Sequence, residues 1–245
     1  MSSTKVAVVT GANQGIGRHI ATQLAELGYT VYLGARDELR GRETAAELMA
    51  RGLDVRPVHL DVTAPATIAA AATTVAAEQD HLDALVNNAG ISTGFQPPSA
   101  VGLEQLRATF ETNVFGVVSV TNAFLDLLRA SGAPRIVNVS SGLGSISQMA
   151  SQIPSGAGLN AVAYQASKAA LNMVTVSYAK ELASAGVKVN AINPGYRATN
   201  LGGGAPMPGA GDPAEGAVVA VQLATCGEDG PTGAFVSDNG AQLPW

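Results

Sequence analysis

Seven apolar runs, separated by stretches that can form helices and loops, most strongly constrain how this 245-residue chain can fold. The runs are rich in Val and Ile and do not alternate with polar residues, which is typical of strands buried on both faces. Such strands belong to a parallel sheet with helices on each side. The sequence therefore predicts an α/β fold, a doubly wound, seven-stranded parallel sheet. The expected strands are residues 5–10, 30–35, 54–62, 82–88, 134–141, 187–193 and 233–237.

The composition argues against several other classes of protein. Hydrophobic residues make up 47% of the chain and charged residues 13%, so a disordered chain is not expected. The formal net charge is −5 and no basic patch stands out, which argues against binding to nucleic acid or to anionic membranes. No apolar run reaches the length of a membrane span, and no signal peptide is evident, so we expect a cytoplasmic protein. His19, His59 and His81 are scattered without other ligands at metal-binding spacing, so we expect no metal site.

No stretch of the sequence has the character of a linker between domains. We therefore expect a single dinucleotide-binding catalytic domain over residues 1–245. The Gly- and Pro-rich residues 202–213 are predicted to form a mobile loop over a site rather than a domain boundary.

A glycine-rich turn, TGANQGIG at residues 10–17, joins the first expected strand to the first expected helix. Gly11, Gly15 and Gly17 would permit a tight turn, a close backbone approach to a pyrophosphate, and packing of helix against strand. The spacing is G-x-x-x-G-x-G rather than G-x-G-x-x-G. At the junction of a strand and a helix, this turn predicts dinucleotide binding in a Rossmann fold.

The end of the second expected strand bears on the choice of dinucleotide. An NAD site usually carries an acid in this region, bonded to the ribose 2′-hydroxyl. Ala35 and Arg36 stand there instead, and the guanidinium of Arg36 could meet the 2′-phosphate of NADP. The alternative is that Arg36 is a solvated residue at a strand end. Asp37 is predicted to cap the following helix.

A tyrosine and a lysine stand four residues apart in AYQASK at residues 163–168, inside a run with helical character. Tyr164 and Lys168 would lie on one face of a helix, about 6 Å apart along its axis. A cation beside a phenol favours the phenolate, so we expect Lys168 to lower the pKa of Tyr164. Such a tyrosine could exchange protons near neutral pH.

Together these features resemble the short-chain dehydrogenase/reductase family, and the resemblance covers almost the whole chain. The ending GPTGAFVSDNGAQLPW and the stretch GANQGIG resemble the carbonyl-reductase-like branch. The motifs that carry it fall in the family's order, namely TGANQGIG, Asp61 after the third strand, NNAG at 87–90, Asn113 in the fourth helix, Ser141 in NVSS, Tyr164-x-x-x-Lys168, and NPG at 193–195 followed by Thr199.

The resemblance implies a role for each of four catalytic residues. Tyr164 would be the general acid in reduction and the general base in oxidation, and Lys168 would lower its pKa and hold the nicotinamide ribose. Ser141 would hydrogen-bond the substrate oxygen, and Asn113 would help hold a water in a proton relay. Ser140 is a rival candidate for the serine.

The resemblance also implies which residues would contact NADP. Asp61 and Val62 would line the adenine pocket. Residues 87–90 would lie behind the cofactor, and residues 194–199 would flank the nicotinamide. Asn88 could equally be a structural residue that bridges strands. The implied cofactor contacts are Gly11, Asn13, Gln14, Gly15, Ile16, Gly17, Arg36, Asp61, Val62, Asn87, Ala89, Gly90, Tyr164, Lys168, Pro194, Gly195 and Thr199.

The chain departs from the family pattern between Ser141 and Tyr164, which stand 23 residues apart where many members have about a dozen between them. The extra residues, about 145–158, are predicted to shape the substrate mouth and to cover a helix face that other members use to form tetramers. Whether the chain is a monomer or a homo-oligomer therefore stays undecided. Tyr196, Met207 and residues 146–153 are expected to border the substrate, with Ser141 and Tyr164 at its reacting oxygen.

These observations predict an NADP-dependent enzyme that reduces a ketone, aldehyde or quinone-like carbonyl to the alcohol, reversibly. One alternative is an NAD-dependent alcohol dehydrogenase of the same fold. Another is a regulator that binds NADP without turnover, although such a protein has no need of all four catalytic residues.

Overall fold

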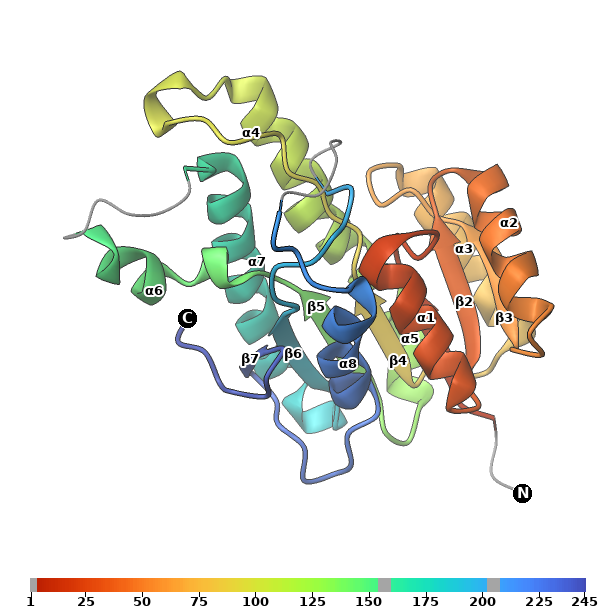
Figure 1. Cartoon of the computed structure of the whole chain (residues 1–245). Coiled ribbons are helices and arrows are strands. Elements are labelled where there is room, and N and C mark those ends of the chain that lie inside the picture. Colours follow the sequence, from red (N-terminus) through yellow and green to blue (C-terminus); the bar gives the residue numbers. More distant parts are fainter. Residues whose placement is uncertain (1–3, 154–159, 202–207) are drawn as a thin grey trace.

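The computed structural model describes residues 4–153, 160–201 and 208–245, and it contains the predicted parallel sheet (Figure 1). The strands run in the order β3-β2-β1-β4-β5-β6-β7, and every neighbouring pair is parallel. Their bounds are β1 Val6–Val9, β2 Thr30–Ala35, β3 Val55–His59, β4 Ala84–Asn87, β5 Arg135–Val139, β6 Lys188–Asn193 and β7 Phe235–Ser237. All seven predicted strands are thus confirmed, several of them shorter at the ends than expected.

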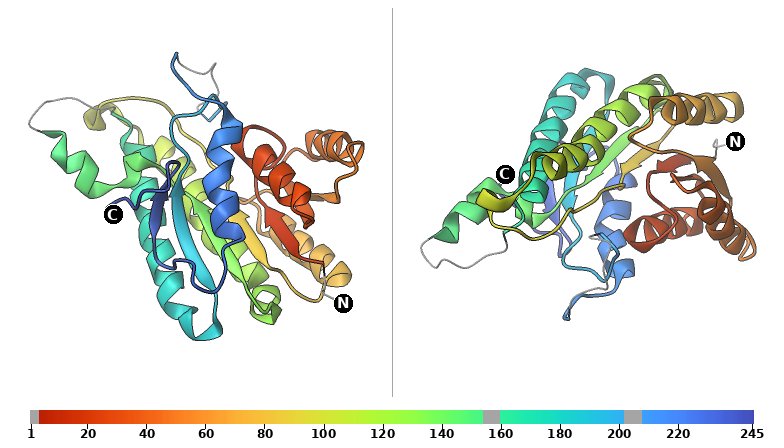
Figure 2. Two further views of the ribbon diagram at one scale, coloured as in Figure 1. Left: turned by 60° about the horizontal axis from the view of Figure 1, so that its bottom comes forward. Right: turned by 90° about the horizontal axis from the view of Figure 1, so that it is seen from above.

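Two layers of helices cover the sheet, one on each face, as Figure 2 shows from above. Helices α1, α2 and α8 pack on one face, and α3, α5 and α7 pack on the other. The bounds are α1 Gly15–Glu26, α2 Glu38–Met49, α3 Pro65–Glu78, α4 Leu103–Phe110, α5 Gly116–Ala130, α6 Ile146–Ser151, α7 Val162–Glu181 and α8 Pro213–Ala224. Within the described ranges, no helix is long and apolar enough to cross a membrane.

The central strands show why their sequences lack polar alternation. In β1, Val6 and Val8 join the apolar core under α3, α5 and α7, while Ala7 and Val9 join the core under α1, α2 and α8. All four side chains are 0% exposed. Successive residues of a strand point to opposite faces, so a strand covered on both sides must be apolar at every position.

The strand order places a topological switch point between β1 and β4, because the chain leaves β1 toward β2 and returns on the other side. In open α/β sheets, ligands bind outside the carboxyl ends of the strands at such a point. The glycine-rich turn follows β1 and residues 88–90 follow β4, so both predicted motifs lie there.

Helix boundaries follow local sequence signals. The carboxylate of Asp37 accepts a hydrogen bond from the backbone N–H of Arg40, at 3.1 Å, which confirms it as the cap of α2. Asp212 caps α8 in the same way, and Pro213 supplies its first residue. Of the predicted mobile loop at 202–213, residues 202–207 lie outside the described residues, as does the predicted substrate neighbour Met207.

Packing at Gly17 generates a stability prediction. A Cβ at position 17 would lie 2.3 Å from the side-chain nitrogen of Asn88 and 2.5 Å from the carbonyl oxygen of Gly11. Gly17→Ala should therefore lower the free energy of unfolding by about 2 kcal/mol, although alanine favours a helix intrinsically. Denaturant unfolding without cofactor measures the change.

A matched control for this substitution is Gly132→Ala, because a Cβ at position 132 meets no atom within 4 Å. The control should change the free energy of unfolding by less than about 0.5 kcal/mol. Equal stability of the two variants would contradict the close packing of α1 against the Asn88 side chain.

Candidate active site at the carboxyl edge of the sheet

Helix α7 brings Tyr164 and Lys168 together on its buried face. Their side chains are one helical turn apart, and the Lys168 Nζ lies 5.5 Å from the centroid of the Tyr164 ring. Tyr164 is 8% exposed and Lys168 is 3% exposed. The Lys168 Nζ donates a hydrogen bond of 2.7 Å to the carbonyl oxygen of Val139, the last residue of β5. This bond fixes α7 against the carboxyl end of the sheet.

Burial shifts the pKa of both groups. Desolvation raises the pKa of the Tyr164 phenol to about 12, although the neighbouring Ser141 hydroxyl lowers this pKa to a smaller extent. Desolvation also lowers the pKa of Lys168 to about 8. The expectation of a lowered pKa for Tyr164 is therefore wrong. The cost of removing the phenolate from water outweighs any attraction across 5.5 Å.

The two candidate serines face opposite ways at the end of β5. The Ser140 hydroxyl is buried and donates a hydrogen bond of 2.6 Å to the Asn172 side chain, inside the core. The Ser141 hydroxyl accepts the backbone N–H of Leu143 at 3.2 Å, and it lies close enough to the Tyr164 phenol to influence its pKa. Ser141 is therefore the serine that meets Tyr164, while Ser140 has a structural contact.

Asn113 lies in the fourth helical segment as predicted, within a π-helical turn, Glu111–Phe115, that joins α4 to α5 without a break. Its side chain is 0% exposed. It accepts the backbone N–H of Ile91 at 2.9 Å and donates to the Ile91 carbonyl at 2.9 Å and to the Ser167 hydroxyl at 3.0 Å. Single π turns often occur at functional sites, because the extra residue turns a side chain out of the regular spacing.

Gly90 shows how closely these elements converge. A Cβ at position 90 would lie 3.3 Å from the Asn113 Oδ1 and 3.5 Å from the Lys168 Nζ. The segment after β4 thus passes directly over both side chains. Residues from β4, the π turn, β5 and α7 meet at one edge of the sheet.

The glycine-rich turn supplies an anion site beside them. Gly11 and Gly15 have φ of +61° and +54°, a backbone conformation that L side chains rarely adopt. Helix α1 then begins with no side-chain cap and no acidic residue in its first turn, so its first N–H groups and its dipole are left for a ligand anion. The Asn88 side chain fastens the turn by donating to the carbonyls of Thr10, at 2.9 Å, and Gly11, at 3.0 Å.

Other predicted cofactor residues near this turn have identifiable surroundings. The Asn13 carbonyl accepts the Thr44 hydroxyl at 3.1 Å. The Ala89 N–H donates to the Thr10 hydroxyl at 3.0 Å. Gln14 precedes α1 and is exposed, and Ile16 packs partly against the core.

The side chain of Asn87 does not face this edge. It is 2% exposed and donates to Thr121 at 3.1 Å and to Asn138 at 2.9 Å, inside the protein. A ligand contact by the Asn87 side chain is therefore excluded by its position within the sheet, and only its backbone is left for the predicted role. Asn88 has the strand-bridging contacts that were its structural alternative.

The region after β2 and β3 holds the residues predicted for the adenosine end. Arg36 is exposed, and in the part of the chain that the structure describes it forms no ion pair. Asp61 lies in the turn after β3, where its Oδ1 accepts the N–H and hydroxyl of Thr63 at 2.9 and 2.8 Å. Val62 is buried and packs against Gly116 at the start of α5.

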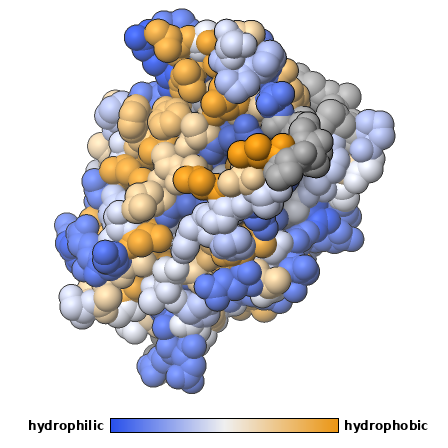
Figure 3. Space-filling view, turned by 90° about the vertical axis from the view of Figure 1, so that its left-hand side faces the viewer, coloured by the Kyte–Doolittle hydropathy of each residue, from blue (hydrophilic) through white to orange (hydrophobic). Residues whose placement is uncertain are grey.

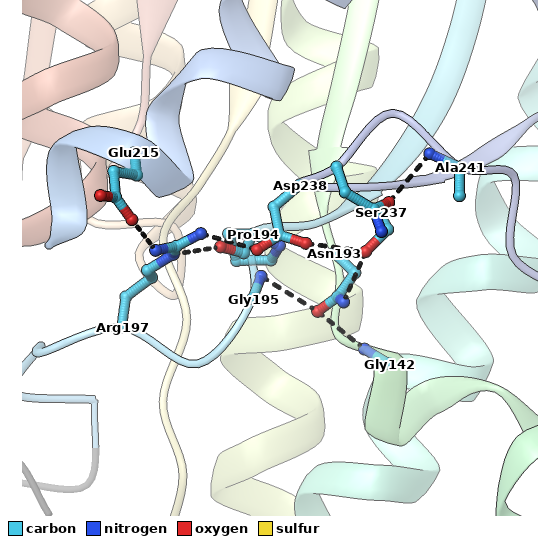
Figure 4. A network of polar contacts seen from close by, with 10 residues as sticks. Gly142, Asn193, Pro194, Gly195, Arg197, Glu215, Ser237, Asp238 and Ala241 are labelled. Carbon is cyan, nitrogen blue, oxygen red and sulfur yellow. Dashed lines mark hydrogen bonds and ion pairs between the residues drawn. The ribbon is translucent and has the colours of Figure 1, made fainter. Parts of the chain in front are cut away.

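Sequence reasoning missed Arg197, which anchors the segment after β6 (Figure 4). Its guanidinium, 11% exposed, pairs with Glu215 of α8 and with Asp238 after β7, the latter at 2.6 Å. Its Nε donates to the Pro194 carbonyl at 2.7 Å. The signal in the sequence was the one charged residue in an otherwise uncharged stretch, 194–211.

The anchored segment reaches the glycine-rich turn. A Cβ at position 15 would lie 3.4 Å from the Cγ2 of Thr199. At its other end, the Asn193 Oδ1 accepts the N–H groups of Gly142, at 3.0 Å, and Gly195, at 3.3 Å. The segment therefore spans from the Ser141 loop to the start of α1, which places Pro194, Gly195 and Thr199 along the predicted cofactor site.

Comparisons with known proteins agree with this arrangement. A family model for short chain dehydrogenases matches residues 5–206. The chain belongs to this family. Its members are oxidoreductases, so the chain is identified as an oxidoreductase of the short-chain dehydrogenase family.

Individual relatives cover most of the chain. The short-chain dehydrogenase anuI of Penicillium roqueforti is 39% identical over 231 residues, which is 90% of this chain and 88% of that protein. A cyclopentanol dehydrogenase of Comamonas sp. is 38% identical over 197 residues, 80% of this chain and 74% of that one. The crystal structure of an NADPH-bound carbonyl reductase from chicken fatty liver superposes with a TM-score of 0.85 at 28% identity, covering 99% of each chain.

Among the described residues, no group of three or more His, Cys, Asp or Glu side chains is arranged to hold a metal ion. Ser141, Tyr164, Lys168 and Asn113 lie at the carboxyl edge of the sheet.

The buried ammonium of Lys168 should make stability depend on pH. Below about pH 8 the lysine is charged in both the folded and unfolded states, so its desolvation cost is fully present. Between about 8 and its ordinary 10.5, the folded state loses the proton first and stability rises with pH. The shift corresponds to about 3 kcal/mol.

The difference in the free energy of unfolding between Lys168→Met and the parent should therefore favour the variant most at pH 7. This difference should fall by about 3 kcal/mol by pH 10.5. Denaturant unfolding of both proteins at several pH values measures this difference. The exposed Lys180 at the end of the same helix provides the control, since Lys180→Met should show no such trend. If the free energies of unfolding of Lys168→Met and the parent differ by the same amount at every pH, Lys168 is not buried as a charged group.

Proposed function

We propose that the chain catalyses the NADPH-dependent reduction of a carbonyl group to the alcohol, with Tyr164 as the proton donor. The observation that carries this proposal is the placement of the Ser141 hydroxyl beside the Tyr164 phenol, next to the buried Lys168 and near the uncapped start of α1. A carbonyl oxygen between these side chains would meet two hydroxyl donors at once.

The residues at the carboxyl edge suit a nicotinamide dinucleotide. The uncapped first turn of α1 would hold its pyrophosphate, and Pro194 to Thr199 would lie along its nicotinamide end. Lys168 and Asn113, which converge under Gly90, would face the ribose side of the site. When bound, the dinucleotide supplies the hydride that a carbonyl carbon accepts.

Ser141 and Tyr164 then act on the substrate oxygen. Negative charge develops on that oxygen as the carbon is reduced, and two hydroxyl donors placed there stabilise it. The raised pKa keeps Tyr164 protonated at neutral pH, which is the state that a proton donor requires. Donation of the proton leaves a phenolate, and the Lys168 ammonium on the same face of α7 compensates its charge.

Lys168 could also supply a proton that restores the Tyr164 phenol after it has donated its own. With a pKa of about 8, its ammonium is charged at neutral pH but can release a proton more readily than an exposed lysine. The buried Asn113, which fixes the backbone at Ile91, holds the wall of the site opposite α7 and so would position a water for proton exchange. In the oxidising direction the same groups act in reverse.

The choice of NADPH over NADH rests on the end of β2. Ala35 is apolar and buried where an acid would repel a 2′-phosphate, and Arg36 is exposed beside it. A guanidinium can make charge-assisted, bidentate hydrogen bonds to a phosphate. The chicken carbonyl reductase of similar fold is NADPH-bound, which supports the proposal.

Two other functions were open from the sequence. An NAD-dependent alcohol dehydrogenase would use the same Ser141 and Tyr164, and it differs only in what Arg36 contacts. A regulator that binds NADP without turnover would not need a serine beside the tyrosine, so the closeness of Ser141 to Tyr164 favours an enzyme.

Tyr164→Phe should lower kcat by at least about 10²-fold while cofactor affinity changes only a few-fold, because the ring remains and the proton donor is lost. The measurement is oxidation of NADPH with a carbonyl panel, together with cofactor titration. Tyr178→Phe is the control: Tyr178 lies on the same helix, and its hydroxyl bonds to Asn122 away from the site. Turnover by Tyr164→Phe close to that of Tyr178→Phe would reject Tyr164 as the acid.

The parent should prefer NADPH to NADH by about 10²-fold in kcat/KM. Ala35→Asp combined with Arg36→Ile should reverse this preference, because the aspartate repels the 2′-phosphate and can accept the ribose hydroxyls of NADH. Arg129→Ile removes an exposed arginine on α5 and should leave the preference unchanged. A parent that already prefers NADH would show that Arg36 is only a solvated surface residue.

A further inference from the structure

We propose that the substrate cleft selects neutral, apolar carbonyl compounds and rejects those that carry a carboxylate or phosphate. This inference rests on the proposed function, since it concerns what Ser141 and Tyr164 act on. Two observations lead to it. The segments around the site carry almost no free charge, and they expose large apolar side chains.

Three segments follow β4, β5 and β6 at the carboxyl edge of the sheet, where Ser141 and Tyr164 lie, and hydrogen bonds join them. The Ser92 N–H donates to the Leu201 carbonyl at 3.1 Å, which ties the segment after β4 to the segment after β6. Asn193 ties that second segment to the loop after β5 through Gly142 and Gly195. The walls therefore belong to one connected rim at the carboxyl edge of the sheet.

The rim is almost without charge. The sequence has no Asp, Glu, Lys or Arg between residues 88 and 103 or between 141 and 153. Within 194–201 the one charged residue is Arg197, and its guanidinium is buried against Glu215 and Asp238 (Figure 4). Lys168 is 3% exposed and bonded to the Val139 carbonyl.

An anionic substrate would therefore enter without a counter-charge from the rim. A carboxylate that leaves water must be paired or hydrogen-bonded, and otherwise its desolvation opposes binding. Arg197 cannot serve, because two carboxylates already face it. The rim instead disfavours an anion relative to a neutral compound of the same shape.

Apolar side chains replace the missing charges. Tyr196 is 51% exposed, Leu201 39%, Phe95 52% and Ile146 69%, and all four belong to the three wall segments. Apolar surface gathers on the side of the molecule that carries α6 and the C-terminal segment (Figure 3). Large exposed apolar side chains around a site gain free energy when a ligand covers them.

The test compares two ketones of similar shape, 4-methylcyclohexanone and 4-oxocyclohexanecarboxylate. The parent protein with NADPH should reduce the neutral ketone with a kcat/KM at least about 10²-fold higher. Equal values, or a preference for the carboxylate, would overturn the proposal.

Binding separates this proposal from the proposed function. In saturation-transfer NMR with the NADP-loaded protein, the neutral ketone should give signals that the carboxylate does not. If the neutral ketone binds and neither compound is reduced, the proposed function fails while the substrate class stands. Binding of both ketones alike, or of neither, would overturn the substrate class.

A gain of function tests the missing charge directly. Tyr196→Lys places an ammonium one residue from Gly195, on the rim, and should shift the kcat/KM ratio toward the carboxylate by about 10-fold or more. Leu27→Lys adds the same charge at the exposed residue that ends α1, far from the carboxyl edge, and should leave the ratio unchanged. The same ratio in both variants would overturn the proposal.

Discussion

The hydrogen bond from the Lys168 ammonium to the Val139 carbonyl is the contact on which the arrangement of the active site depends. It joins the longest helix of the described chain to the carboxyl end of a central strand. Because Ser141 follows that strand by two residues and Tyr164 precedes Lys168 by one turn, the same bond sets the distance between the two hydroxyls. A charged group is buried to make this contact, which costs stability and explains why the pKa of Lys168 falls to about 8.

The two ends of the predicted cofactor site are held by different means. The glycine-rich turn depends on close packing, since Asn88 fills the space that a side chain at Gly17 would need. The segment after β6 depends on charge, since Arg197 links it to α8 and to the residues after β7. Both sets of contacts join segments that are distant in sequence.

Much of the fold could be predicted from the sequence because strands buried on both faces leave a strong pattern. The choice of Ser141 over Ser140 could be made only from the resemblance, and the structure supplies its physical reason in the opposite directions of the two hydroxyls. The pKa of Tyr164 could not be predicted, because spacing on a helix shows proximity to Lys168 but does not show burial. The π turn at Asn113 and the inward side chain of Asn87 were also hidden, since both depend on how α5 packs on the sheet.

The central claim is that a hydride reaches a carbonyl carbon at the Ser141–Tyr164 site. The most direct measurement uses NADPH deuterated at both C4 positions, with a neutral cyclic ketone, and mass spectrometry of the alcohol product. We expect one deuterium on the carbinol carbon of the alcohol, and a much smaller amount of this alcohol with Ser141→Ala but not with Leu27→Lys. An alcohol without deuterium, or no alcohol from any of a panel of neutral ketones, would contradict the account.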